Sequence, residues 1–375
     1  MTGHVRRRGE RSWELKFDVG RDAGTGKRKI QYHSFKGTKK QAEVRLAELI
    51  ASVSTGSYVE PTKIAVGEFA RARVQQWEAA GDITARTAQR YHQLVENQIV
   101  PHLGAKTLQK LSRLDIEAWH TALRSTGLAP RTIGHAHRVL AKALSDAEND
   151  SIIIRNVCKQ RKAPKVPESE QAIVKDIPAL MGKIAAARLY PMAVLALFAG
   201  LRLGEVLALK DGRLDLDGGV VQVREALEET KANGVVFKAP KSDAGRRDIT
   251  LPDIAIEALR EHRRQLLEFR MKLGAGKLPE DALLFANIEG RPLRPSTVSS
   301  DWGSLAARIG MPEITFHGLR HTHASQLISA NVDIVTISKR LGHAKPSVTL
   351  AIYAHMFTTD DRKAAAAINA AFNVS

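Results

Sequence analysis

The spacing of apolar residues changes along the chain and divides it into three segments. Between residues 12 and 35 apolar and polar residues alternate, so "SWELKFDV" and "IQYHSF" predict two strands joined by the turn "GRDAGTGKRK". Apolar residues then recur at helical spacing over 38–53, where Thr38 provides a capping side chain. The pattern predicts a small β-rich domain at residues 1–55, with its sheet packed on one helix.

Residues 64–158 carry a helical pattern throughout. Apolar residues between Val66 and Trp77 mark a first helix, and "TARTAQRYHQLVENQIVPHLG" predicts a second that is stopped by Pro101 and Gly104. Two further helices open with Ser or Pro start signals in "SRLDIEAWHTALRSTGL" and "APRTIGHAHRVLAKALSDAEND". We expect an all-α domain of four or five helices at 64–158, between the linkers "STGSYVEPTK" and "KQRKAPKVPESEQ".

Residues 171–375 combine apolar helices with a short sheet. The β-branched runs in "GGVVQVREA" and "GVVFKAPKSDAGRRDITLP" predict strands around a tight turn at Ser242–Gly245. This segment is predicted to be an α+β domain of catalytic size, which makes the whole chain multidomain. Helical spacing predicts its helices at 177–210, 253–272, 296–309, 317–330 and 333–341.

Charge narrows the choice of partner. The net charge is +17, and the excess is spread: residues 1–63 carry 14 Lys and Arg against 7 Asp and Glu, residues 64–170 carry 16 against 11, and residues 171–375 carry 27 against 22. Each segment can therefore contact a polyanion, which favours nucleic acid over the alternative of a basic surface that only aids solubility.

Two absences in the sequence bound the class of protein further. Arg202 and Glu205 interrupt the most apolar stretch before it reaches the roughly 20 clean residues of a membrane span. The N-terminus lacks an apolar signal core, and the single Cys158 excludes an intramolecular disulfide framework and any multi-cysteine metal site. We expect a cytoplasmic protein with no membrane partner.

The string "TFHGLRHTHASQLI" at residues 315–328 crowds imidazoles beside a guanidinium. A metal is one interpretation, because His317 and His321 lie four apart, but Gly318 stands where the zinc-protease spacing requires a glutamate. A phosphate is the other, because Arg320 offers a planar fork of donors. We expect His321 and His323 to be helix-packing or DNA-proximal residues.

Three more strings follow a fixed order in the same segment. Arg202 lies in "AGLRLGEVLAL", Lys241 in "KAPKSDAGRRDITL", and "LGHAKPSVTLAIYAH" supplies His343 and Tyr353. Each has a structural alternative when taken singly. Arg202 could pair with the glutamate three residues on, Tyr353 could be a core tyrosine, and Lys241 could be a solvated turn residue with Lys238 as a rival.

In order and spacing these strings resemble the tyrosine recombinase family, the integrases of phages and integrative elements. That family shows an arginine in G-L-R-x-x-E, a β-hairpin lysine, an H-x-L-R-H pair, a histidine in L-G-H and a tyrosine nine or ten residues later. The segment with "IVPHLGAKTLQKLSRLDIEAW" is similar to its core-binding domain, and residues 1–55 to its arm-binding domain. Gly318 departs from the common aspartate, which would loosen the helix start. Matched by position, the resemblance implies the catalytic set Arg202, Lys241, His317, Arg320, His343 and Tyr353.

The chemistry of such a set can be built from the residue types. A tyrosine hydroxyl has a pKa of about 10, so surrounding cations must favour its ionised form before it attacks a phosphodiester. Arg202 and Arg320 would neutralise charge on the nonbridging oxygens, and Lys241 would protonate the departing 5′ oxygen. His317 and His343 would position the phosphate or move the tyrosine proton. We expect no metal and no cofactor, and the sequence has no G-x-x-x-x-G-K-[ST] loop for ATP.

The resemblance also implies partners and leaves two other functions open. It implies double-stranded DNA attachment sites, a monomer that forms a homotetramer on DNA through the C-terminal helix "DRKAAAAINAAFNV", and accessory DNA-bending or directionality proteins. The alternatives are a type IB topoisomerase-like nicking-closing enzyme and a noncatalytic DNA-binding regulator. In the first domain, which could instead contact only proteins, we expect these phosphate contacts: Arg6, Arg7, Arg8, Lys27, Arg28 and Lys29.

Overall fold

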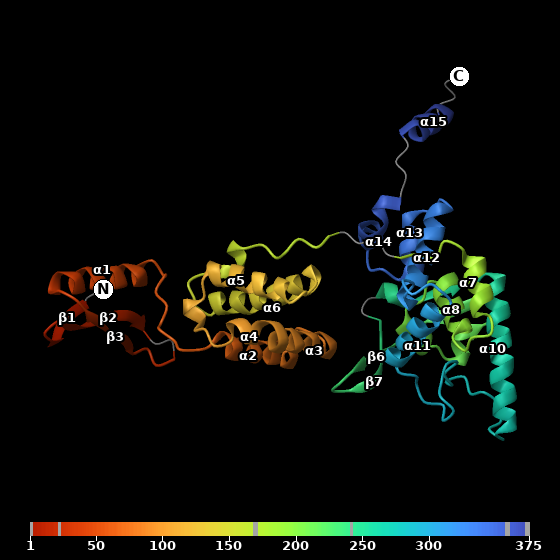
Figure 1. Cartoon of the computed structure of the whole chain (residues 1–375), viewed down its shortest axis with the longest axis horizontal. Helices are drawn as coiled ribbons and strands as arrows, with labels where there is room; N and C mark the ends of the chain where they lie inside the picture. The colour runs from red at the N-terminus through yellow and green to blue at the C-terminus, as the bar shows by residue number, and fades with distance from the viewer. Residues whose placement is uncertain (1–2, 22–23, 168–171, 241–242, 357–360, 372–375) are drawn as a thin grey trace. The chain divides into compact units, whose positions relative to one another are not determined.

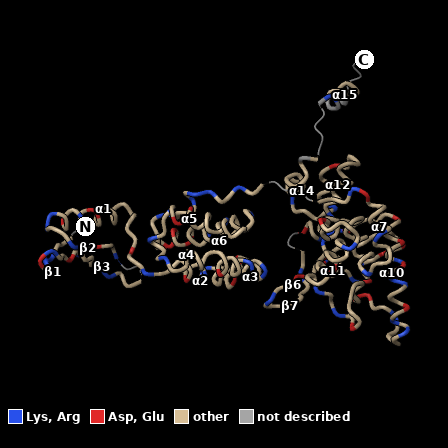
Figure 2. The backbone as a smooth tube through the Cα atoms, in the orientation of Figure 1, with Lys and Arg blue, Asp and Glu red and all other residues tan. Residues whose placement is uncertain are grey.

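The computed structural model describes residues 3–21, 24–167, 172–240, 243–356 and 361–371. The chain divides into two compact units, Met1–Glu168 and Ser169–Ser375. Lys and Arg are spread along both units and are interspersed with Asp and Glu (Figure 2). No helix in the described part of the chain is long and apolar enough to cross a membrane.

The N-terminal unit begins with a three-stranded antiparallel sheet in the order β1-β2-β3, formed by Gly3–Gly9, Ser12–Arg21 and Arg28–Lys36. Helix α1 (Lys39–Ser54) covers one face of this sheet (Figure 1). Leu15 and Phe17 of β2 pack there against apolar residues of α1. The two predicted strands and the predicted helix are confirmed, and Thr38 caps α1 reciprocally with Gln41.

Strand β1 was not predicted from the sequence, because Val5 is its only apolar residue apart from the glycines at its ends. Pairing with β2 sets its two faces: Val5 lies opposite Leu15, toward α1, and Arg6 lies opposite Glu14, on the open face. The basic run at the N-terminus is therefore one edge of a sheet, and its successive arginines point to opposite faces.

A helical segment follows, with a hydrophobic core of its own. Its α-helices are α2 (Val66–Ala79), α3 (Ala85–Leu94), α4 (Val100–Leu103), α5 (Arg113–Ser125) and α6 (Pro130–Asn149). The prediction that Pro101 stops the second helix is wrong. The chain passes through a π-helical turn, Val95–Ile99, and continues into α4, where Pro101 is the second residue and its missing N–H costs little. Gly104 ends the helix, as predicted.

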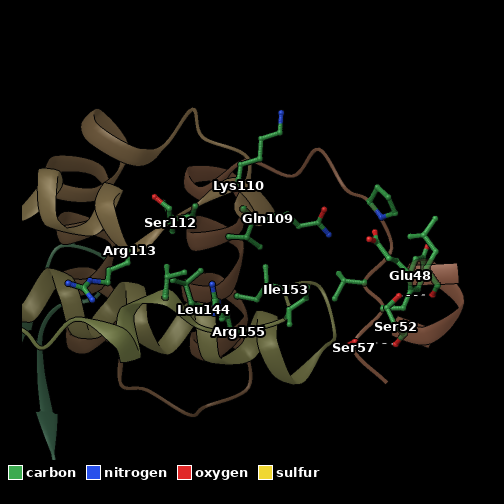
Figure 3. A pocket seen from close by; sticks show the side chains of 18 of the residues that line it. Glu48, Ser52, Ser57, Gln109, Lys110, Ser112, Arg113, Leu144, Ile153 and Arg155 are labelled. Atoms are coloured by element: carbon green, nitrogen blue, oxygen red, sulfur yellow. Dashed lines mark hydrogen bonds between the residues drawn. The ribbon is translucent and has the colours of Figure 1, made fainter. Parts of the chain in front are cut away.

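The connection between the sheet and the helical segment is anchored on both sides. Gln109 accepts from Thr62 N at 3.1 Å and donates to Glu60 O at 2.8 Å. The Glu60 carboxylate in turn accepts a hydrogen bond from Lys29 Nζ at 2.7 Å. Beside it lies a groove of about 740 Å³, which Figure 3 shows with side chains from α1 and from the helical segment facing one another. The groove contains none of the residues predicted to be catalytic.

The C-terminal unit is α+β, as predicted. Strands β4 (Leu214–Asp215), β5 (Val220–Val223) and β8 (Arg247–Thr250) form one antiparallel sheet, and β6 (Ala226–Thr230) pairs with β7 (Gly234–Lys238). Helix α12 (Phe316–Ser329) packs against α8 (Tyr190–Phe198) within the core (Figure 1). The helices are α7 (Ile177–Ile184), α8 (Tyr190–Phe198), α9 (Leu203–Leu207), α10 (Asp253–Lys272), α11 (Pro295–Arg308), α12 (Phe316–Ser329), α13 (Ile334–Leu341), α14 (Pro346–Tyr353) and α15 (Asp361–Ala371).

The predicted helix at 177–210 is three helices in the structure, α7, α8 and α9. The break before α9 occurs at Gly200, whose φ of +67° lies in the left-handed region that favours glycine. A Cβ at Gly200 would also lie 2.6 Å from His323 Cδ2. The turn allowed by Gly200 leaves Arg202 in an extended conformation at the N-cap of α9, outside the helix.

Candidate active site

Five of the six predicted catalytic residues lie in the described part of the C-terminal unit. Arg202 precedes α9, His317 and Arg320 lie on α12, His343 follows α13, and Tyr353 ends α14. Lys241 lies outside the described residues. Its rival Lys238 is the last residue of β7 and forms an ion pair with Glu228.

Arg320 is at the centre of the site. The residue is 3% exposed, and its guanidinium donates from Nη1 to Gly200 O at 2.5 Å and from Nη2 to Leu341 O at 2.6 Å. These bonds join α12 to the turn before α9 and to the end of α13. Burial, and then the charge of Arg202, lower the pKa of Arg320 to about 9, so the side chain stays charged at neutral pH.

His343 is a hydrogen-bond acceptor from Arg320. Its Nε2 lies 3.1 Å from Arg320 Nη2, and a guanidinium can only donate, so Nε2 carries no proton. The proton then lies on Nδ1, which donates to Thr349 Oγ1 at 2.7 Å. Burial and the neighbouring guanidinium of Arg320 lower the pKa of His343 to about 4. The ring is therefore neutral and fixed in one tautomer.

Arg202 pairs with Glu205, as the structural alternative for that arginine supposed, but the pair belongs to the site. Arg202 Nη1 lies 2.7 Å from Glu205 Oε1, and Arg202 Nη2 is 3.5 Å from Gly342 O, next to His343. The Arg202 side chain keeps 39% of its surface exposed, whereas Glu205 keeps 5%. The half-exposed guanidinium is held from behind by a buried carboxylate and remains open to a ligand.

Tyr353 is buried and bonded to His321, a residue that the sequence predicted to be helix-packing or DNA-proximal. Its hydroxyl lies 2.6 Å from His321 Nδ1. Burial raises the pKa of Tyr353 to about 12 and outweighs the lowering by Arg320. Arg320 thus acts in the expected direction, but burial outweighs it and the hydroxyl keeps its proton at neutral pH. The signal for His321 was its place four residues after His317, on the same helix face.

His317 stacks edge-on against His321, with 4.7 Å between ring centroids. The side chain keeps an exposed surface, but the surrounding protein and then the charges of His321 and Arg320 lower its pKa to about 4. His323 packs in the interior, where Nδ1 donates to Leu197 O at 2.9 Å and Nε2 accepts from Arg340 at 3.1 Å. Within the described ranges, no group of three His, Cys, Asp or Glu residues could hold a metal.

The helix that carries these histidines has an intact start. Thr315 caps α12 by accepting from Gly318 N at 2.9 Å, so the expectation that Gly318 loosens this turn is wrong. A Cβ at Gly318 would lie 3.1 Å from Ala172 O, tighter than an ordinary contact. Glycine therefore permits close packing of the helix start against the preceding segment.

The six basic residues predicted to contact phosphates in the first domain are distributed around its sheet. Arg6, Arg8 and Arg28 lie on or beside the open face, where Arg8 pairs with Glu14 at 2.6 Å and Arg28 with Asp18 at 2.5 Å. Arg7 lies on the α1 side, opposite Trp13. Lys27 precedes β3, and Lys29 bonds the connecting segment through Glu60, as described above.

The open face also carries residues that the sequence analysis did not select. Lys16 lies 5.8 Å from the ring centroid of Tyr32, and Tyr32 is 57% exposed. Both line the hollow that contains Arg6 and Arg28. Alternation along β2 and β3 was the available signal, because it places Lys16 and Tyr32 opposite the buried residues.

The α+β fold of the C-terminal unit, with two arginines, three histidines and a tyrosine gathered in it, is typical of a tyrosine recombinase. The family model described as "Phage integrase family" matches residues 170–359, half of the chain. The chain belongs to the phage integrase family and is a site-specific DNA recombinase, as the order of its motifs predicted.

Individual relatives agree with this assignment. A protein of Caldanaerobacter subterraneus subsp. tengcongensis described as "Tyrosine recombinase XerC-like" is 25% identical over 396 aligned positions, which cover 99% of each chain. The Tn1549 transposon integrase in complex with a circular intermediate DNA has a TM-score of 0.68 at 20% identity, over 82% of this chain and 99% of that one. A lambda integrase tetramer bound to a Holliday junction has a TM-score of 0.56 at 18% identity, over 92% of each chain. The two structures show that the fold is shared.

Proposed function

We propose that the C-terminal unit cleaves DNA by attack of the Tyr353 oxygen on the scissile phosphorus, with formation of a 3′-phosphotyrosyl bond and departure of the 5′ oxygen. Arg202 and Arg320 neutralise the nonbridging oxygens. Lys241 gives the 5′ oxygen its proton, and reversal of the same step by a 5′ hydroxyl rejoins the strand. The observation that carries this proposal is the Tyr353 hydroxyl at 2.6 Å from His321, on the helix that also supplies Arg320.

His321 takes the hydroxyl proton in this scheme, and His317 and His343 contact the phosphate. Because the pKa of His321 is lowered by burial and by Arg320, the ring is neutral at neutral pH. We infer that Nδ1 is its unprotonated nitrogen and accepts from the tyrosine hydroxyl. The pair is neutral and buried. Because Tyr353 is 4% exposed, we infer that α14 has to move before the oxygen can reach the phosphate.

The first test is covalent attachment to DNA. Purified protein, incubated with a duplex that carries its attachment site, forms a denaturant-stable adduct whose modified peptide contains Tyr353, whereas Tyr353→Phe forms none and still binds the site. An adduct that persists in Tyr353→Phe contradicts the assignment. Strand exchange between two sites then separates a recombinase from a nicking-closing enzyme, which relaxes supercoiled DNA that carries one site. A noncatalytic regulator gives neither product.

We further propose that residues 1–55, 64–158 and 171–375 act as an arm-binding, a core-binding and a catalytic domain in the cytoplasm. The open face of the β1-β2-β3 sheet suits a DNA groove, because Arg6, Lys16 and Arg28 surround an exposed tyrosine on it. Footprinting of the full chain against one that starts at Lys63 tests the domain division. The shorter chain keeps the core protection and loses a distal patch, and identical footprints contradict an arm-binding role.

A matched pair of double variants tests which face of the sheet binds. Arg6→Ala with Arg28→Ala removes two charges from the open face, and Arg7→Ala with Lys29→Ala removes two from elsewhere on the sheet. The first pair should weaken distal binding and reduce the slope of log affinity against log salt by about 2. The second should leave the distal footprint intact. Equal effects would contradict binding through the open face.

We propose that the protein forms a homotetramer on two attachment sites, as the lambda integrase tetramer does on a Holliday junction. Helix α15 of one copy would dock on helices α13 and α14 of the next copy. Ile368 of α15 is 59% exposed, and α13 and α14 expose Val335, Val348 and Leu350. A chain that ends at residue 360 should bind one site as a monomer and recombine poorly. Undiminished synapsis would place the α15 contact within one chain. DNA-bending or directionality proteins are the further partners we propose.

A further inference from the structure

A buried arginine behind the site contacts three of the segments that carry candidate catalytic residues. Arg247 is the first residue of β8, and its side chain is 7% exposed. It donates from Nη1 and Nη2 to the two oxygens of Glu205 at 3.2 and 2.9 Å, and from Nε to Arg340 O at 2.7 Å. Nη1 also lies 3.1 Å from Gly245 O. Arg247 does not face the open side of the site, so its contribution acts through these neighbours.

Glu205 is shared between Arg247 and Arg202. Its Oε1 accepts from both guanidinium groups, while Oε2 accepts from Arg247 Nη2 and from Arg202 N at 3.0 Å. Burial alone would raise the pKa of Glu205, but the charge and hydrogen bonds of Arg247, and then those of Arg202, lower it to about 2. The carboxylate therefore stays ionised, and two guanidinium groups share its single charge.

Arg247 also packs against the turn that precedes His343. Gly342 ends α13 with a φ of +65°, and a Cβ there would lie 2.8 Å from Arg247 Nη1. The carbonyl of the same glycine faces Arg202 Nη2 at 3.5 Å. Gly342 therefore lies between the guanidinium groups of Arg247 and Arg202, and both arginines contact the turn that it forms.

We propose that Arg247 is a positioning residue of the recombinase: it holds both oxygens of Glu205 and so keeps the Arg202 guanidinium in place, with its charge available to the scissile phosphate. The inference rests on the proposed role of Arg202. Charge balance gives the reason, because Glu205 neutralises one of the two arginines. With Arg247 present, Arg202 retains positive charge toward the substrate. Without Arg247, the whole carboxylate charge falls on Arg202 and cancels it.

The test compares cleavage of two DNA substrates that differ in one atom group. One carries the normal scissile phosphate, and the other carries a methylphosphonate, which lacks the negative charge that Arg202 would neutralise. Arg247→Met should slow adduct formation on the phosphate about 100-fold, the scale of losing one preorganised charge donor. On the methylphosphonate the same variant should lose less than about 10-fold, because less charge has to be stabilised there. An equal loss on both substrates would overturn the proposal, since general loosening of the fold slows both alike.

The double variant with Glu205→Gln gives a second, independent measurement. If Arg247 acts through the Glu205 carboxylate, removal of that charge should make Arg247→Met with Glu205→Gln no slower than Arg247→Met alone. Multiplication of the two single losses would overturn the proposal. If Arg247→Met does not fold, Arg247→Gln removes the charge but keeps a polar side chain for Glu205, and its loss should again be larger on the phosphate than on the methylphosphonate.

Two controls separate failure of the inference from failure of the proposed function. Arg188 of the same unit pairs with Asp301 in an exposed setting, at 61% side-chain exposure. Arg188→Met should cleave both substrates at the wild-type rate with unchanged DNA affinity. If the wild-type chain forms no adduct through Tyr353, the proposed function fails. If it does and Arg247→Met matches it on both substrates, only the inference fails.

Discussion

The helical segment α2–α6 and the C-terminal unit both bury histidines, but they surround them differently. In the helical segment His120 Nε2 meets His137 Nδ1 at 3.1 Å, and within the described residues His120 Nδ1 has no partner. In the C-terminal unit His323 and His343 each use both ring nitrogens. The His120–His137 contact is a polar pair enclosed by an apolar core. His323 and His343 belong to a network of donors and acceptors.

The difference shows what makes a buried imidazole useful for chemistry. Burial lowers the pKa of His120 and of His343 alike, to about 4 in both. Among the described residues, guanidinium groups bond neutral histidine rings directly in the C-terminal unit alone, through Arg320 and Arg340, which fixes each tautomer. Burial alone gives a neutral histidine, whereas a bonded arginine gives a neutral histidine whose acceptor atom has a known direction.

Arg320→Ala should have the largest effect, because it removes the arginine that bonds His343. The variant loses the donor to His343 and leaves Gly200 O and Leu341 O without their buried donor, so both cleavage and stability fall. We expect cleavage to drop at least about 100-fold and the free energy of unfolding to drop by about 3 kcal/mol. Adduct formation and denaturant unfolding measure the two effects. Arg188→Ala, which breaks an exposed pair with Asp301, should change neither, and a stable Arg320→Ala would contradict the structural part.

A second, smaller effect is expected from His321→Phe, which removes the acceptor 2.6 Å from the Tyr353 hydroxyl. The proton of the tyrosine then has to pass to water, and cleavage should slow about 100-fold, with normal DNA affinity. Raising the pH should recover part of the rate, because hydroxide replaces the missing acceptor. A single-turnover rate measured between pH 7 and 9 checks this. A wild-type rate at neutral pH would show that His321 only packs against Tyr353.

The helical segment should weaken in acid through its histidine pair. Because the folded-state pKa of His120 is lowered from 6.5 to about 4, the unfolded chain binds more protons between these values. The stability contributed by the neutral ring is complete above pH 6.5 and falls as the pH drops toward 4, by at most about 1.4 kcal/mol per pH unit. Hydrogen exchange of α5 and α6 measures it. His120→Phe should reduce this dependence, and an unchanged acid profile would contradict the role of the pair.

The smallest effect concerns a contact within the helical segment that involves no histidine. Lys142 Nζ lies 3.4 Å from the centroid of the Trp77 ring, which also donates to Asp146 at 2.7 Å. Lys142→Met keeps the stem but loses the cation–π attraction, so the free energy of unfolding should fall by about 0.5–1 kcal/mol. Urea unfolding at two salt concentrations checks the value. A loss larger than that of Arg320→Ala would reverse the expected ranking.

Periodicity and end signals predicted much of the fold. Helix α10 spans the predicted 253–272, because its apolar spacing is regular and Pro252 precedes it. The prediction failed where tertiary contacts decide the backbone. Gly200 breaks one apolar run because its left-handed turn fits against His323, which is distant in sequence. Pro101 is tolerated because a π-helical turn precedes it. Local sequence carries neither fact.

Motif order also selected the candidate site residues, but not the residues that support them. Arg202, Arg320 and Tyr353 stand in recognisable strings, whereas Arg247 follows "SDAGR" with nothing to distinguish it from the arginine before it. Its partner Glu205 belongs to the G-L-R-x-x-E string, but the sequence predicted only a local pair with Arg202 for it. Strand pairing and the end of α13 give Arg247 its place, and these meet only in the folded chain.

The two carbonyl bonds of Arg320 bear on how such a protein can change over evolutionary time. A descendant that loses recombination but keeps DNA binding can lose the Tyr353 hydroxyl at little cost to folding, because a phenyl ring fills the same space. It cannot lose Arg320 as easily, since Gly200 O and Leu341 O depend on that side chain. We therefore expect inactive descendants of this lineage to retain the arginine long after the tyrosine has gone.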